Sequence, residues 1–139
     1  MRASAIAAVF LLALAACGIP AAGPQMDPGK DCMSCHTGSV APSWTVSGTL
    51  FASASSAPDQ GLEGGQILIT DALNRTLTLN TNGAGNFYTA EDLKPPFRVQ
   101  AQFGNRRLAM VREVTTGSCN SCHANPGLQD APGRVFVGH

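Results

Sequence analysis

The chain has 139 residues, nine Lys or Arg and nine Asp or Glu, so its formal net charge is zero and only 13% of its residues are charged. This length allows one domain with a hydrophobic core and is too short for two ordinary domains. The balanced charge excludes electrostatic attraction to nucleic acid, which we do not expect as a partner. Fifteen Gly and nine Pro, with few aromatic residues, favour turns and strands over helices.

The chain begins with a pattern typical of export. Arg2 provides a positive charge, and the apolar run from Ile6 to Ala16 has the length of a signal-peptide core rather than of a membrane-spanning helix. The last residues of this run and Cys17 resemble the bacterial lipobox (Leu14-Ala15-Ala16-Cys17). The resemblance implies cleavage after residue 16 and attachment of lipid to Cys17, which would make a stable membrane anchor. An ordinary signal peptide with an incidental cysteine is the alternative.

Residues 17–31 have the composition of a flexible tether. Three Pro and three Gly follow Cys17, without any apolar periodicity. The residue after Cys17 is Gly18 and not Asp, which resembles outer-membrane lipoproteins in the proteobacterial sorting scheme. We therefore expect an exported protein that lipid holds at the cell envelope, with the outer membrane favoured.

One five-residue pattern, Cys-x-x-Cys-His, occurs twice, at Cys32–His36 and at Cys119–His123. It is the signature of covalent c-type haem attachment, because two thiols at this spacing can form thioethers with the two haem vinyl groups while the histidine binds the iron. A chance match in a chain with 5 Cys and 3 His is expected on the order of 0.003 times. We predict two covalent haems, with thioethers at Cys32, Cys35, Cys119 and Cys122 and proximal iron ligands at His36 and His123.

Other uses of the cysteines are less consistent with the pattern. Two Cys-x-x-Cys pairs are also a zinc signature, but a four-cysteine zinc site does not need a histidine after each pair. Short disulfides explain neither the histidines nor the repeat, and a thioredoxin-like dithiol lacks its βαβ surroundings. Export also leads to a compartment where thiols oxidise and c-type haem is assembled. With Cys17 used for lipid, haem attachment accounts for every cysteine.

The second axial ligand of each iron is left open by the sequence. His139 is the only remaining histidine, so at most one haem can have two histidine ligands within one chain. Met110 and Met26 are the other candidates, since a thioether ligand raises the reduction potential relative to histidine. An iron without a second ligand would permit peroxidase-like chemistry or reduction of a nitrogen oxide, although the sequence offers no evident distal acid or base.

From Trp44 onward, short alternating or apolar runs are separated by turn residues. In residues 76–80, for example, Leu77 and Leu79 alternate with polar residues, as in a half-buried strand. We expect Trp44 and Phe87 to belong to the core and residues 104–107 to form a turn. The predicted strands are Thr45–Ala52, Gln66–Thr70, Thr76–Asn80, Asn86–Thr89, Phe97–Phe103 and Leu108–Val114, with a candidate seventh at Arg134–Val137.

Three stretches of this region carry a family resemblance: Val46–Leu50, Leu62–Asp71 and Leu79–Phe87. They resemble the carboxypeptidase regulatory-like domain, a prealbumin-like sandwich, over residues 44–112. The resemblance implies a non-catalytic scaffold with Greek-key strands. The haem motifs on both sides depart from that family, so the resemblance predicts the frame and not the function.

The predicted architecture is all-β: one Greek-key β-sandwich of six or seven strands at residues 44–114, flanked by haem-binding segments at residues 32–43 and 115–139. Because the two ends of a sandwich can lie near each other, we expect the haems to be close. These features indicate a lipid-anchored dihaem c-type cytochrome that exchanges electrons with redox proteins of the envelope. We expect neither enzymatic activity nor an organic substrate. The alternative is an envelope scaffold whose cysteines and histidines bind zinc or form disulfides.

Overall fold

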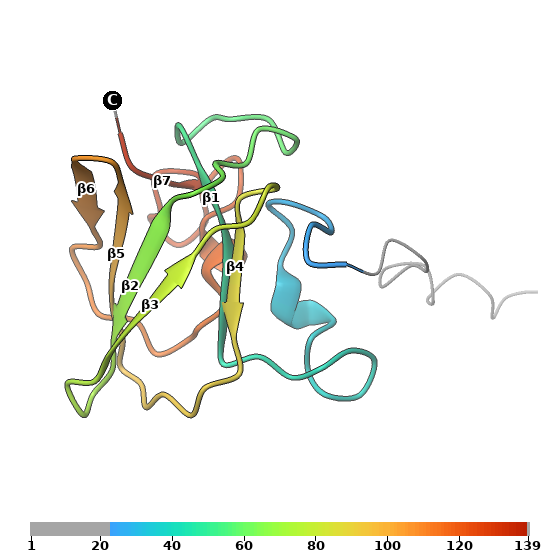
Figure 1. The fold of residues 1–139 in the computed structure, drawn as a ribbon, viewed down its shortest axis with the longest axis vertical. Helices are drawn as coiled ribbons and strands as arrows, with labels where there is room; N and C mark the ends of the chain where they lie inside the picture. Colours follow the sequence, from blue (N-terminus) through green and yellow to red (C-terminus); the bar gives the residue numbers. More distant parts are fainter. Residues whose placement is uncertain (1–22, 139) are drawn as a thin grey trace, which may run out of the picture.

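The computed structural model describes residues 23–138, which form two facing β-sheets (Figure 1). One sheet has the strand order β4-β1-β7 and the other β3-β2-β5-β6. The chain crosses between the sheets after β1, after β3, after β4 and after β6, and the predicted all-β sandwich is confirmed. The strands are β1 (Val46–Phe51), β2 (Gln66–Thr70), β3 (Thr76–Asn80), β4 (Asn86–Thr89), β5 (Arg98–Phe103), β6 (Arg106–Ala109) and β7 (Val135–Phe136).

Two short helical turns carry the repeated motif. The 3-10 turn η1 spans Cys32–Ser34, and α1 spans Cys119–Cys122. Within residues 23–138 no helix is long and apolar enough to cross a membrane. The predicted signal peptide, Cys17 and His139 lie outside the described residues.

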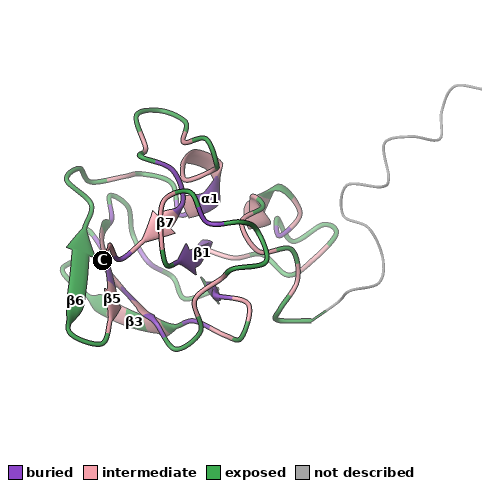
Figure 2. Cartoon of the chain, turned by 90° about the horizontal axis from the view of Figure 1, so that it is seen from above, coloured by how far each residue is buried: buried purple, intermediate pink, exposed green. Residues whose placement is uncertain are grey.

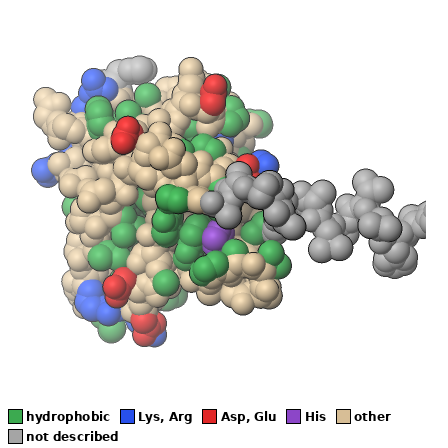
Figure 3. Space-filling model, turned by 45° about the vertical axis from the view of Figure 1, so that its right-hand side comes forward, with side chains coloured by type: hydrophobic (Ala, Val, Ile, Leu, Met, Phe, Trp, Pro, Cys, Tyr) green, Lys and Arg blue, Asp and Glu red, His purple; other side chains and the backbone are tan. Residues whose placement is uncertain are grey.

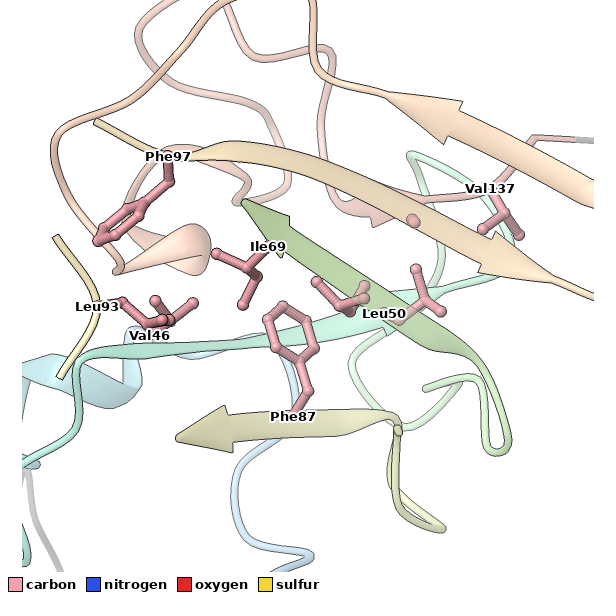
Figure 4. Packing of buried hydrophobic residues seen from close by; sticks show 9 residues of the cluster. Val46, Leu50, Ile69, Phe87, Leu93, Phe97 and Val137 are labelled. Carbon is pink, nitrogen blue, oxygen red and sulfur yellow. The ribbon is translucent and has the colours of Figure 1, made fainter. Parts of the chain in front are cut away.

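The core lies between the two sheets. Val46 and Leu50 from β1, Ile67 and Ile69 from β2 and Phe87 from β4 are at most 1% exposed. Figure 4 shows Leu50, Ile69 and Phe87 pointing toward one another from three strands. Alternation explains the contribution of β2, because its isoleucines fall on one face while the residues between them stay half exposed. Phe87 is a core residue, as expected.

Strand β1 is buried on both faces, since all six of its residues are buried (Figure 2). Val46 and Leu50 face the other sheet, whereas Ser47 and Thr49 alternate with them and are polar, yet only 1% and 0% exposed. Buried hydroxyl groups need hydrogen-bond partners. The segments that carry the two motifs cover this polar side, because both η1 and α1 contact β1.

The sixth strand differs from the prediction. We expected a turn over residues 104–107 and a strand at Leu108–Val114, but β6 is Arg106–Ala109. Gly104 has a φ of 60°, a left-handed conformation that glycine adopts readily, and it allows a tight reversal directly after β5. The strand therefore ends just before Met110.

Candidate functional site

Both copies of the motif are closed by the same backbone hydrogen bond. The His36 amide donates to the Cys32 carbonyl over 3.0 Å, and the His123 amide donates to the Cys119 carbonyl over 2.9 Å. These are the bonds of one α-helical turn, which places the two thiols and the imidazole of a copy on a single short turn. The two motif segments, which are more than 80 residues apart in the chain, thus share the same hydrogen-bonded turn.

A serine stabilises the turn in each copy. The Ser34 hydroxyl donates to the Asp31 carbonyl over 2.7 Å, and the Ser121 hydroxyl donates to the Ser118 carbonyl over 2.6 Å. Each serine is the residue before the second cysteine, and each acceptor is the residue before the first. Asp31 adds a cap of its own, because its carboxylate accepts from the amide of Met33 over 3.1 Å.

Both motif histidines are oriented by a backbone carbonyl. Nδ1 of His36 lies 3.0 Å from the carbonyl oxygen of Pro42, and Nδ1 of His123 lies 2.9 Å from that of Gly133. A carbonyl oxygen only accepts hydrogen bonds, so Nδ1 carries the proton and Nε2 of the neutral ring keeps its lone pair. Metal-binding histidines commonly make this contact, which fixes the tautomer and the plane of the ring.

The cysteines differ in their state. Cys32, Cys119 and Cys122 are free thiols, whereas Cys35 is disulfide-bonded, so a thioether at Cys35 requires reduction of that bond first. Burial raises the pKa of the Cys32 thiol. Burial, followed by the nearby sulfur of Cys32, raises the pKa of Cys119 to about 12. These two thiols therefore stay protonated at neutral pH.

Hydrogen bonds join the two motif segments directly. The Ser118 hydroxyl donates to the Asp31 carboxylate, and the Asn120 side-chain amide donates to the Lys30 carbonyl over 2.8 Å. Asn120 also accepts from the backbone amide of Thr49 in β1 over 3.1 Å. The expected proximity of the two motifs is thus present, and β1 lies at their junction.

A cavity of about 330 Å³ opens beside the second motif. Cofactor sites typically have volumes of about 300–1,000 Å³ and mostly apolar walls. Cys119, Cys122 and His123 line it together with Met110, which is 38% exposed. Two thiols, an imidazole and a thioether around an apolar space fit what a covalent haem requires. The apolar wall comes mainly from β5, β6 and β7: Val99, Ala101, Leu108, Val135 and Phe136.

Gly48 makes room for the second motif against the core. A Cβ atom at this position would lie 2.7 Å from the ring of Phe87 and 2.8 Å from Cβ of Cys119. Both distances are well below van der Waals contact, so any side chain at Gly48 would push Cys119 away from β1.

The first motif is flanked by an aromatic stack. The ring of His36 lies 3.4 Å from that of Trp44 with an angle of 8° between the planes, and Trp44 lies 4.3 Å from Tyr88 at 11°. His36 is 8% exposed, whereas Tyr88 is 38% exposed. The expectation that Trp44 belongs to the core is wrong. Trp44 is not part of the buried cluster between the sheets, and its ring packs against His36 and Tyr88 instead.

The other methionine candidate is not brought to the cavity. Met26 does not line it, and the Met26 carbonyl accepts from the side-chain amide of Asn86 over 2.7 Å. His139, like Cys17, lies outside the described residues. In the described part of the chain, no three His, Cys, Asp or Glu side chains form a group that could hold a metal ion by themselves.

Sequence reasoning missed Asn120, Tyr88 and Arg134. Asn120 lies inside the second motif, but the motif does not specify that residue, so only its contacts reveal its role. Tyr88 lies on an exposed position of β4, and nothing in the alternation of that strand indicates a stacked partner. Arg134 is buried beside the cavity, although Arg is among the residues least often found fully buried.

No family model matches the chain, and no curated protein or solved structure matches it either. The resemblance to the carboxypeptidase regulatory-like domain therefore stays a prediction.

Proposed function

We propose that the protein is a dihaem c-type cytochrome lipoprotein that carries single electrons at the bacterial cell envelope. The observation that carries the proposal is the shared geometry of the motifs. In each, one helical turn bears two cysteines and a histidine whose Nδ1 is held by a carbonyl, at His36 and His123, leaving Nε2 for iron. Bound haem would supply one-electron exchange between ferrous and ferric iron.

At the second motif, Cys119 and Cys122 would hold the haem and His123 would bind its iron. Met110 is our candidate for the other axial position, because it lines the same cavity as His123. A methionine ligand and an apolar wall both favour ferrous iron, since neither offers the charge or polarity that stabilises the ferric state. We therefore expect the haem at the second motif to have the higher reduction potential.

At the first motif, Cys32 and Cys35 would hold the haem, and the stacked rings of Trp44 and Tyr88 extend from the iron ligand His36 to an exposed side chain. Rings in contact provide a short path between the iron and solvent, as an electron carrier needs. On the face shown in Figure 3, hydrophobic side chains are interspersed with polar ones and charged side chains are scattered. The exposed end of the stack, Tyr88, offers an aromatic surface. Redox partners would dock there through apolar contacts.

The test is to produce the full chain in a bacterium with a c-haem assembly system and to measure its mass and visible spectrum. We expect a mass increase of two haems, an intense Soret band and haem that resists acid-acetone extraction. The double variant C119A/C122A should lose one haem, whereas Ser121→Ala, in the same motif, should keep both. A colourless protein that contains zinc would instead support the scaffold alternative.

Axial ligation is tested by exposing the reduced protein to carbon monoxide. If Met110 binds iron, Met110→Ala should open one haem to carbon monoxide, while Met26→Ala should respond as the natural protein does. A natural protein that already binds carbon monoxide, or that reduces peroxide, would favour the enzymatic alternative.

A further inference from the structure

The aromatic stack beside the first motif contains two different ring contacts. Trp44 and Tyr88 have ring centres 4.3 Å apart with an angle of 11° between the planes, so one ring is displaced sideways over the other. His36 and Trp44 have ring centres only 3.4 Å apart, with an angle of 8°. Atoms of stacked rings approach each other to about 3.5 Å. The imidazole of His36 therefore lies centred over the indole, without a sideways offset.

A centred face-to-face contact is one that two neutral aromatic rings avoid. The π electrons make both faces negative, and such pairs prefer an offset or an edge-to-face arrangement. The contact becomes attractive when one ring is electron-poor, since an indole face is the best aromatic partner for a positive group. An imidazole becomes electron-poor when its nitrogen gives its lone pair to a metal ion. The contact between His36 and Trp44 is thus the one expected for a metal-bound histidine.

Stacking is compatible with ligation by His36. The indole covers a face of the imidazole, whereas Nε2 binds a metal in the plane of the ring. Nδ1 of His36 lies 3.0 Å from the carbonyl oxygen of Pro42, and this bond holds the plane of the ring parallel to the indole. His36 is 8% exposed, so solvent screens the electrostatic effect of the indole only weakly.

We propose that Trp44 lowers the reduction potential of the haem at the first motif by stacking on its iron ligand, so that electrons pass from the first haem to the second. The inference rests on the proposed function and names a positioning residue in one of its sites. A ligand of ferric iron is more electron-poor than a ligand of ferrous iron, so the indole stabilises the ferric state.

The surroundings of the second motif act in the opposite direction. Met110 and the apolar wall of the cavity favour the ferrous state there. One electron accepted from a reduced redox protein at the first motif would therefore pass to the second motif, which is reduced as the first is oxidised again. The stack with Tyr88 marks the side at which the electron enters.

The experiment uses the full chain matured with haem and compares Trp44→Leu with Phe103→Leu. Phe103 packs against the core between the sheets and belongs neither to the stack nor to the cavity wall. In a spectroelectrochemical titration, Trp44→Leu should raise the lower of the two midpoint potentials and leave the higher one unchanged, whereas Phe103→Leu should change neither. Trp44→Phe keeps a ring with a weaker π face and should give a smaller rise. C119A/C122A, which keeps only the first haem, should show only the lower potential.

The sign of the shift separates this role from simple packing. If Trp44 only kept water away from His36, its loss would admit water, which stabilises ferric iron, and the lower potential would fall. A fall or an unchanged potential in Trp44→Leu, with two haems still present by mass, would overturn the inference and leave the proposed function standing. Retention of the higher potential in C119A/C122A would do the same. A natural protein that carries no haem at the first motif would overturn the proposed function together with the inference.

Discussion

Substitution of Asn120 should weaken the contact between the two motif segments. It is 4% exposed, and its side chain bonds to three atoms in two other segments. It accepts from the Thr49 amide over 3.1 Å, donates to the Thr49 hydroxyl over 3.1 Å and donates to the Lys30 carbonyl over 2.8 Å. Alanine at this position keeps the helical turn and removes all three bonds.

The expected loss of unfolding free energy follows from the hydrogen bonds that Thr49 and Lys30 would lose. The Thr49 amide is buried and would have no acceptor, which costs about 1–3 kcal/mol. The Lys30 carbonyl lies next to an exposed side chain, so water can replace the lost donor and the cost there is about 1 kcal/mol. We expect Asn120→Ala to lower the free energy of unfolding by about 2–4 kcal/mol.

Urea unfolding of the chain, produced without residues 1–16 and without a haem assembly system, measures this value. The matched control is Asn80→Ala, because Asn80 is exposed on β3 and makes a single side-chain bond, to Gln66 over 3.3 Å. The control should change the unfolding free energy by less than about 0.5 kcal/mol. A loss in Asn120→Ala no larger than that of the control would refute the idea that Asn120 joins the segments.

Three further predictions concern the frame. Burial disfavours the charge of Asp71, but its bonds to Arg75 outweigh this and hold the pKa at about 2, below the ordinary 3.8. Asp71 therefore stabilises the fold above about pH 4, and this contribution disappears as the pH falls toward 2; melting curves of Asp71→Asn and the natural protein should converge over that window. Phe87→Ala should lower the unfolding free energy by about 3–5 kcal/mol in urea. Gly48→Ala should cost about 1–3 kcal/mol in the same assay because of its contacts with Phe87 and Cys119.

Patterns along the chain predicted the strands that have one buried face. Gln66–Thr70, Thr76–Asn80 and Asn86–Thr89 have the boundaries that alternation and turn residues indicated. The misplaced strand, β6 at Arg106–Ala109, is exposed at all four residues. An exposed edge strand has no buried face and hence no alternation to detect, so its two arginines resembled a turn.

The site was predictable only within each motif. Spacing over five residues determines the helical turn, because its bonds connect residues four apart. The contact between Asn120 and Lys30 joins residues 90 positions apart, and no local pattern encodes it. The cavity likewise needs β5, β6, α1 and β7 together, so the sequence named Met110 as a candidate ligand without placing it beside His123, and it gave no role to Arg134.

The position of β1 explains why the two motifs are not independent of the frame. Gly48 lies against Cys119, and the next residue, Thr49, bonds to Asn120 and accepts from the amide of Gly29 over 2.8 Å. Thr49 is fully buried, and both motif segments contact it. A change that shifts either segment exposes this polar side of β1 and disturbs the other segment through the same residue. The stability of the sandwich and the spacing of the two motifs therefore depend on the same contacts of β1.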